Sequence, residues 1–324
     1  MKRRNALTVL AACLLWPAIA PAQQSKRVPV VGMLITHPPV NDQVVESVRT
    51  GLRQHGYEDG KNIRLEVRTA LGHLERVPAL VQELVQLKVD VIIVANDPAL
   101  RAVLKATSTI PIVMAGYTDD PTAMGWIESY RRPGRNVTGA FTVNSALIAK
   151  RLELIKEMLP DVSRLAVFWE RTFGLSQLEE AQRISPQLGL RLHPIEVRGP
   201  ADLAAAFASA KQVKADAVLL AWTPTFYVKR GRIAALALEA RLPVFSDISW
   251  MTQAGGLLSY GSFGNESFTR AARYVDRLLK GATPADLPVE QMENIKLVVN
   301  AKTAKALGIK IPESILLRAD EVIR

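Results

Sequence analysis

The sequence has a single cysteine, Cys13, and it lies within the first 22 of the 324 residues. If that segment is removed, disulfides, a cysteine nucleophile and a cysteine zinc site are all excluded. Nucleophile-elbow, zinc-protease, dinucleotide-binding and phosphate-loop motifs are missing as well. The four histidines show no metal-ligand spacing. We therefore expect no catalytic residues, no metal site and no cofactor.

Long uncharged apolar runs are absent after residue 30, so the sequence predicts no membrane span of about 20 residues there. A concentrated basic surface is absent too, although 41 Lys and Arg outnumber 31 Asp and Glu. The densest basic cluster is Arg131, Arg132 and Arg135. Nucleic-acid surfaces need a basic stripe with interleaved aromatic residues, and aromatics make up only 6% of this chain. We expect no nucleic-acid partner.

The amino terminus has the pattern of a signal peptide. Basic residues at 2–4 precede a mostly apolar stretch at 6–20, and Ala20-Pro21-Ala22 gives a small-x-small ending. We predict cleavage after Ala22 and a periplasmic mature protein with a net charge of +7 instead of +10. Three alternatives stay open: export by a twin-arginine route, lipidation of Cys13, and an uncleaved anchor.

Short aliphatic runs alternate with amphipathic stretches along the remaining chain. Strands are expected at 28–35, 63–67, 91–95, 110–115, 165–169, 190–197, 217–222, 243–245, 257–260 and 297–299, with helices between most of them. Strand and helix alternation at this spacing predicts an α/β fold with parallel sheets and right-handed crossovers. The length predicts two doubly wound lobes.

No linker rich in Ser, Gly or Pro separates the two lobes. The segment after residue 249 is too short for a third domain, so we expect it to complete a lobe already begun. We assign residues 28–141 and 249–282 to lobe 1, and residues 142–248 and 283–324 to lobe 2. The expected crossovers therefore lie at 142–144, at 246–249 and near residue 283.

In an open parallel sheet, ligands bind outside the carboxyl ends of the strands, where helix amino termini also attract anions. The polar and aromatic residues that follow the expected strands are therefore the candidate ligand contacts: Thr36, His37, Asn96, Asp97, Tyr117, Thr118, Glu170, Trp222, Thr223, Asp247 and Tyr260. Carboxylates, hydroxyls and rings together suit a small polar ligand that has a cationic group and a planar part.

Each candidate also has a purely structural interpretation. Asp97 stands before a proline and is a natural helix cap. Trp222 could pack in a core, and Glu170 or Asp247 could pair with a neighbouring arginine. His37 could be an ordinary residue of a surface loop, and the tyrosines are equally open to both interpretations.

Four segments resemble one known family. They read PGRNVTG at 133–139, LIKEMLP at 154–160, AGGLLSYG at 254–261 and LVVNAKTAKALG at 297–308. These segments are similar to the substrate-binding proteins of ABC importers, of the tryptophan/tyrosine type. The likeness covers nearly the whole mature chain.

The resemblance implies two α/β lobes of the type I periplasmic-binding fold, three hinge crossovers and a small-molecule ligand held between the lobes. It also implies a monomer that delivers its ligand to an ABC permease and catalyses no reaction. Residues 95–99 and 243–250 depart from the family pattern at the expected pocket, so an aromatic amino acid does not follow from the likeness alone. A ligand-sensing domain for a membrane receptor kinase and a secreted enzyme using Glu170 or Asp247 remain as alternatives.

Overall fold

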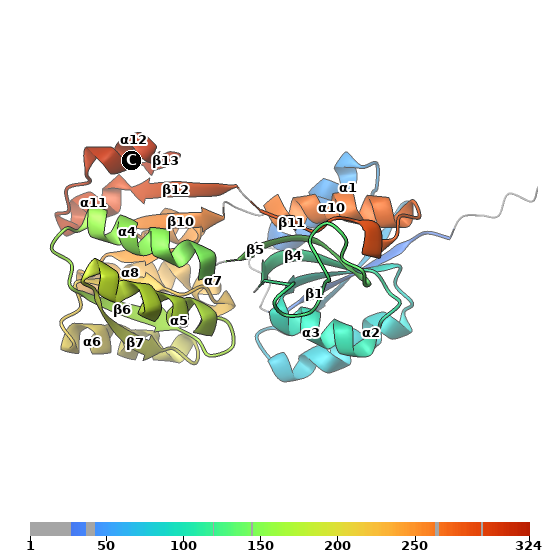
Figure 1. The fold of residues 1–324 in the computed structure, drawn as a ribbon, viewed down its shortest axis with the longest axis horizontal. Helices are drawn as coiled ribbons and strands as arrows, with labels where there is room; N and C mark the ends of the chain where they lie inside the picture. The colour runs from blue at the N-terminus through green and yellow to red at the C-terminus, as the bar shows by residue number, and fades with distance from the viewer. Residues whose placement is uncertain (1–26, 37–42, 119, 144, 263–265, 293) are drawn as a thin grey trace, which may run out of the picture.

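The computed structural model describes residues 27–324 except 37–42, 119, 144, 263–265 and 293. It contains two α/β lobes that lie end to end along the long axis (Figure 1). Each lobe is a sheet covered by helices on both faces, which confirms the predicted fold class. The predicted signal peptide at 1–22 lies outside the described residues. Within the described part of the chain, no helix has the length and apolar character needed to cross a membrane.

The first lobe has a parallel sheet with the strand order β11-β5-β4-β3-β1-β2. Its strands are β1 (Val30–Ile35), β2 (Arg64–Thr69), β3 (Val91–Asn96), β4 (Ile112–Thr118), β5 (Val137–Val143) and β11 (Glu290–Gln291). Its helices are α1 (Gln43–Gln54), α2 (Val77–Gln86), α3 (Asp97–Ala106) and α10 (Glu266–Leu279), with short 3-10 turns at Leu74–Arg76 and Pro284–Asp286. All six residues of β1 and of β3 are buried, as expected of parallel strands covered on both faces.

The second lobe has the strand order β13-β12-β10-β9-β8-β6-β7, and all pairs are parallel except β10 with β12. Its strands are β6 (Arg164–Trp169), β7 (Arg191–Glu196), β8 (Ala217–Leu220), β9 (Val244–Ser246), β10 (Leu258–Ser262), β12 (Ile295–Asn300) and β13 (Glu321–Ile323). Its helices are α4 (Ile148–Met158), α5 (Leu175–Ile184), α6 (Leu203–Gln212), α7 (Pro224–Val228), α8 (Arg230–Ala240), α9 (Ser249–Ala254), α11 (Ala301–Leu307) and α12 (Glu313–Arg318), with 3-10 turns at Ser145–Leu147, Ser185–Leu188 and Pro200–Asp202.

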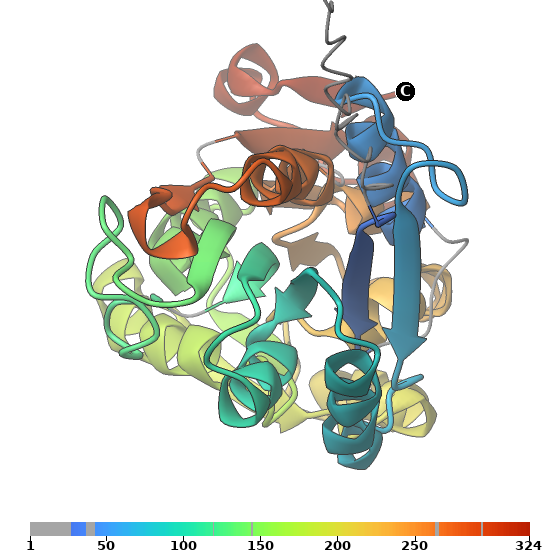
Figure 2. The same ribbon diagram turned by 90° about the vertical axis from the view of Figure 1, so that its right-hand side faces the viewer.

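Each lobe has two cores, one on either face of its sheet. In the first lobe, α1 and α10 cover one face, while α2 and α3 cover the other. Figure 2 shows α10 beside α1 over the first sheet. The two helices approach closely at Gly51, where a Cβ would lie 2.3 Å from the carbonyl oxygen of Thr269. Glycine at this position therefore lets α10 dock against α1.

The expected division of the chain into lobes is wrong in two places. Residues 249–262 belong to the second lobe, because β10 pairs with β9 and β12, and Leu258 lies in that lobe's core. Residues 283–292 belong to the first lobe, because β11 pairs with β5. The chain therefore passes between the lobes after β5, between β10 and α10, and between β11 and β12. A strand's apolar pattern marks it as buried, but it does not reveal which sheet the strand joins.

Candidate functional site

The strand orders place one topological switch point in each lobe. In the first sheet, β2 and β3 flank β1, so the winding reverses between β1 and β3. In the second sheet, β7 and β8 flank β6, and the winding reverses between β6 and β8. Ligands of open α/β sheets bind outside the carboxyl ends of the strands at such points. Thr36 and Asn96 occupy the first of these positions, and Glu170 and Trp222 flank the second.

A cleft of about 370 Å³ lies between the lobes at these strand ends. The first lobe contributes Thr36 and the loop after β2, including Leu71 and Leu74. The second lobe contributes Glu170, Phe173 and the first residues of α7. The volume is in the range of small-molecule sites, and both lobes supply walls. A solute in this cleft would therefore touch both halves of the protein.

Thr36 is held in place by Asn96. The Asn96 side-chain amide donates a 2.6 Å hydrogen bond to the Thr36 hydroxyl oxygen, and both side chains are buried. The carbonyl oxygen of the same amide accepts a 3.3 Å bond from the Ala99 backbone and so caps α3. In this structure Asn96 serves as a cap and as a support for Thr36, and only Thr36 of the two lines the cleft.

Among the described residues that line this cleft, Glu170 is the only one with a carboxylate. Its Oε2 accepts a 3.1 Å hydrogen bond from the Thr225 hydroxyl, and Thr223 caps α7 by accepting a bond from Phe226 N. Burial raises the pKa of Glu170, while the hydroxyl groups of Thr225 and Thr223 act in the opposite direction. Within the described residues no ion pair involves Glu170, so the arginine pairing considered from sequence is not seen there. Its charge is therefore available to a cationic group.

Aromatic rings stand beside this carboxylate. Phe173, in the loop after β6, lines the cleft and packs edge-on against Trp222 with ring centroids 5.8 Å apart. Trp222 is half-buried, and Gln177 accepts a 3.0 Å hydrogen bond from its backbone N–H. The lining of the cleft therefore includes one carboxylate together with apolar and aromatic side chains.

Trp222, Thr223 and Asp247 lie around a second, enclosed cavity inside the second lobe, together with Tyr227. This cavity has a volume of about 10 Å³, which is at the lower limit for a single water molecule. Asp247 is only 2% exposed. These three candidates therefore lie around a separate cavity and are not among the residues that line the cleft.

The other candidates are dispersed. Asp97 lines a neighbouring groove of about 510 Å³ on α2 and α3. Tyr260 packs against the core of the second lobe, and its carbonyl oxygen accepts a 2.7 Å bond from Arg151. The backbone of Tyr117 and Thr118 forms the carboxyl end of β4, and their side chains are not described. His37 lies outside the described residues.

Sequence reasoning missed several residues of the cleft. The loop after β2, with Leu71 and Leu74, follows a strand end that the candidate set passed over. Phe173 and Thr225 lie a few residues beyond Glu170 and Thr223, so a wider window after each strand would have included them.

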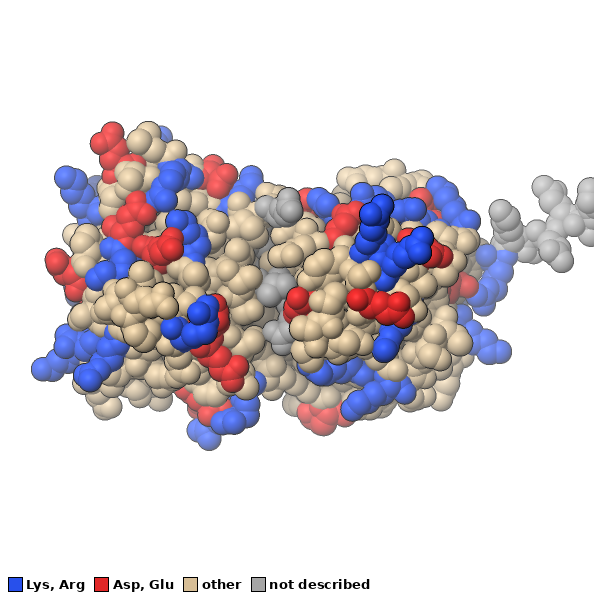
Figure 3. All heavy atoms as spheres, in the orientation of Figure 1, with Lys and Arg blue, Asp and Glu red and all other residues tan. Residues whose placement is uncertain are grey.

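Lys, Arg, Asp and Glu side chains are interspersed over both lobes on the face that Figure 3 shows. Among the residues that the structure describes, no group of three or more His, Cys, Asp or Glu is arranged to hold a metal ion.

Comparison with known proteins identifies the family. The profile of the ABC transporter substrate binding proteins matches residues 28–323. The chain belongs to this family. It is thus a solute-binding component of ABC transport, and proteins of this family bind solutes outside the cytoplasm and are not enzymes.

Three relatives of this substrate-binding protein span most of its length. A tyrosine-binding protein of Clostridioides difficile strain R20291 is 23% identical over 282 residues, which cover 86% of this chain and 80% of the relative. The crystal structure of a conserved domain protein from Vibrio cholerae has 28% identity and a TM-score of 0.83, covering 92% of this chain and all of that one. An ABC domain from Streptococcus pneumoniae in complex with L-Trp has 26% identity and a TM-score of 0.81, covering 91% and 99% of the two chains.

Proposed function

We propose that this substrate-binding protein is periplasmic and carries an amino acid with an aromatic or large apolar side chain to an ABC permease. The observation that carries this proposal is the Glu170 carboxylate in the interlobe cleft, beside the Phe173 ring. A half-buried carboxylate without an ion-pair partner among the described residues is suited to an ammonium group. The relatives that bind tyrosine and L-Trp have ligands with an ammonium group and a ring.

The rim of the cleft supplies the opposite charge. Arg198 and Lys229 line it from the second lobe, and the side chain of Arg198 is 81% exposed. Arg198 is paired with Asp202 at 3.4 Å, so Lys229 contributes more of the positive field that would favour a ligand carboxylate. Exposed cations contribute little each. We therefore propose a zwitterion whose ammonium group contacts Glu170, whose carboxylate faces the rim and whose side chain lies against Phe173 and the leucines of the first lobe.

The arrangement supports binding without turnover. Among the described residues, the hydroxyl groups of Thr36 and Thr225 form hydrogen bonds with Asn96 and Glu170, and neither bond is to a histidine or lysine that could act as a general base. The protein would act as a monomer that changes between open and closed forms, since a ligand touching both lobes favours closure. Export through cleavage after Ala22 remains part of this proposal.

Calorimetry and thermal unfolding of residues 23–324 with L-tryptophan, L-tyrosine and L-phenylalanine test the proposal. Ligand at about 100 times its dissociation constant should add about 2.7 kcal/mol of stability. Indole-3-propionate lacks the ammonium group and should bind far more weakly than L-tryptophan, whereas tryptamine should keep part of the affinity. Equal binding of indole-3-propionate, or no stabilisation by any of these amino acids, would contradict the proposal.

A further inference from the structure

The two lobes also meet at a side-chain contact outside the residues that line the solute cleft. Tyr227, in α7 of the second lobe, directs its hydroxyl to the Gln43 side-chain oxygen of the first lobe, at 3.4 Å. The two residues are 184 positions apart in the sequence, and neither lines the interlobe cleft. The contact therefore depends on how close the lobes are and not on the ligand's own atoms.

Two neighbouring side chains contact the ring of Tyr227. The Trp250 ring lies 4.5 Å away between centroids, and the Arg230 guanidinium lies 4.9 Å from the ring centroid. Arg230 also donates a 2.8 Å hydrogen bond to the Tyr227 carbonyl oxygen. Aromatic pairs and cation–π contacts of this kind restrict the ring to one orientation. The hydroxyl is thus held toward the first lobe, and forming the contact with Gln43 costs little further side-chain entropy.

Burial raises the pKa of Tyr227, and the charge of Arg230 opposes this. The phenol consequently remains protonated, and able to donate, throughout the neutral pH range.

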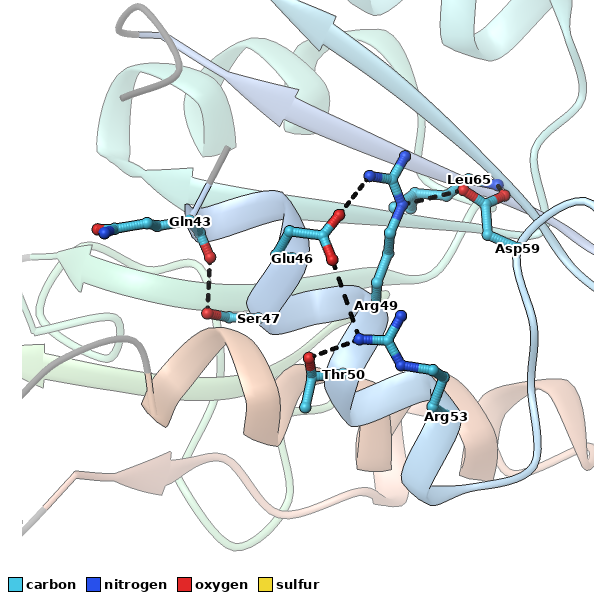
Figure 4. Close-up of polar contacts among 8 residues, drawn as sticks. All are labelled: Gln43, Glu46, Ser47, Arg49, Thr50, Arg53, Asp59 and Leu65. Carbon is cyan, nitrogen blue, oxygen red and sulfur yellow. Dashed lines mark hydrogen bonds and ion pairs between the residues drawn. The ribbon is translucent and has the colours of Figure 1, made fainter. Parts of the chain in front are cut away.

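Gln43, the other residue of this contact, lies on a helix that is well packed in the first lobe. Gln43 begins α1, and Figure 4 shows its side chain extending away from the helix. The helix is fixed to the first lobe by buried Val44, Val45 and Val48, and by a 3.1 Å contact from Arg49 to Asp59, which lies outside the helix (Figure 4). Moving the lobes apart would therefore break the contact, since neither side chain is on a loose segment.

We propose that Tyr227 is a positioning residue that sets solute affinity by stabilising the closed arrangement of the lobes through its hydroxyl contact with Gln43. It acts on the open-to-closed equilibrium and need not touch the solute. When the closed form is a minor state of the free protein, the apparent dissociation constant varies inversely with the population of that form. At 3.4 Å the hydrogen bond is long, so we expect its loss to reduce the closed population only about threefold.

The test measures lobe separation without any ligand, so it does not depend on the proposed solute, although its link to affinity rests on the proposed interlobe site. Residues 23–324 contain no cysteine, so Gln54→Cys and Gln212→Cys place one label on each lobe at exposed positions. Distance distributions are then recorded by single-molecule fluorescence for the wild type, Tyr227→Phe, Gln43→Ala and the double variant. Tyr57→Phe is the matched control, because its hydroxyl contacts Asp276 within the first lobe at 3.1 Å.

We expect Tyr227→Phe and Gln43→Ala each to lower the closed population about threefold, with no further loss in the double variant. Tyr57→Phe should leave the distribution unchanged. With L-tryptophan as probe, dissociation should accelerate by a similar factor while association changes little. The proposal is overturned by a wild type with no closed population, by unchanged distances in Tyr227→Phe, or by additive effects in the double variant. If L-tryptophan fails to bind while the distances shift as expected, the proposed solute is wrong and the role of Tyr227 stands.

Discussion

Replacing Glu170 by glutamine tests the central contact of the proposed site. The substitution keeps the size of the side chain and an acceptor for Thr225, but it removes the charge that would face the ligand ammonium. Hydrogen bonds to charged groups contribute about 1.5–3 kcal/mol, which corresponds to roughly 10- to 150-fold in the dissociation constant. Because glutamine still offers a neutral oxygen, we expect a loss near the lower end, about tenfold.

The pH dependence gives a second measure of the same contact. Burial raises the pKa of Glu170, so its carboxylate becomes protonated at a higher pH than an ordinary glutamate does. Affinity for a cationic ligand should therefore fall as the pH is lowered through this raised pKa. The Glu170→Gln variant should bind more weakly at neutral pH but lose this dependence.

Stability without ligand should change in the opposite direction. A carboxyl group whose pKa is higher in the folded state than in the unfolded state destabilises the fold when ionised, and this loss disappears as the pH falls. Ligand-free Glu170→Gln should therefore unfold at a higher temperature than the wild type at neutral pH. A variant that is only damaged would unfold at a lower temperature.

Titration calorimetry between acidic and neutral pH, combined with thermal unfolding, checks these three expectations. Glu180→Gln is the matched control, because Glu180 pairs with Arg183 on α5 and does not line the cleft. Unchanged affinity in Glu170→Gln, or the same loss in Glu180→Gln, would refute the assignment of the ammonium group to Glu170.

Two further substitutions test the supports of the site. Asn96→Ala removes both the cap of α3 and the bond to Thr36, so unfolding in urea should show a loss of about 0.5–2 kcal/mol, while Asn96→Asp should keep the cap. Gly116→Ala would place a Cβ 2.0 Å from the Ala95 carbonyl oxygen, which forces β3 and β4 apart at a cost of about 1–3 kcal/mol. Gly231→Ala on α8, where a Cβ meets nothing within 4 Å, should not lower the unfolding temperature, and equal effects of the two alanines would contradict this packing argument.

Most of the strands and long helices could be predicted because each carries its own local pattern. For example, Val44, Val45, Val48 and Leu52 recur at helical spacing, and all four are buried on α1. Short elements such as α7, α9 and β11 were missed, since two to six residues carry too little periodicity to separate them from loops. The lobe that each late segment joins depends on pairing between distant strands, which no local pattern encodes.

The candidate site was predictable only in part for a related reason. The strand-end rule directs attention to Thr36 and Glu170, which both line the cleft, because the end of a parallel strand is fixed by the sheet itself. It cannot say whether a side chain at that end faces the cleft or supports its neighbour. Asn96 and Thr223 each cap the next helix through a side-chain hydrogen bond. The sequence pattern does not show these bonds, because they depend on side-chain geometry.

The distribution of the cleft residues between the lobes bears on how closure would be driven. Glu170 and Thr225 both belong to the second lobe, so an ammonium group would bind them equally well in the open form and would not favour closure. Moving a population from 1:99 to 99:1 requires about 5.5 kcal/mol of differential affinity. A hydrogen bond from the ligand to Thr36 would supply about 1 kcal/mol of this difference. The bond between Tyr227 and Gln43 forms without ligand, so it sets the starting population and adds nothing to the differential affinity.

The remainder has to come from apolar contact with the first lobe, where Leu71 and Leu74 line the cleft. At roughly 25 cal/mol per Å², burying about 180 Å² of apolar surface would provide the missing 4.5 kcal/mol or so. A phenyl or indole ring can bury that much, whereas the methyl group of alanine cannot. A small amino acid would therefore bind to Glu170 through its ammonium group without closing the lobes. Selectivity for large apolar side chains would then arise when the lobes close and not when the ammonium group binds the carboxylate.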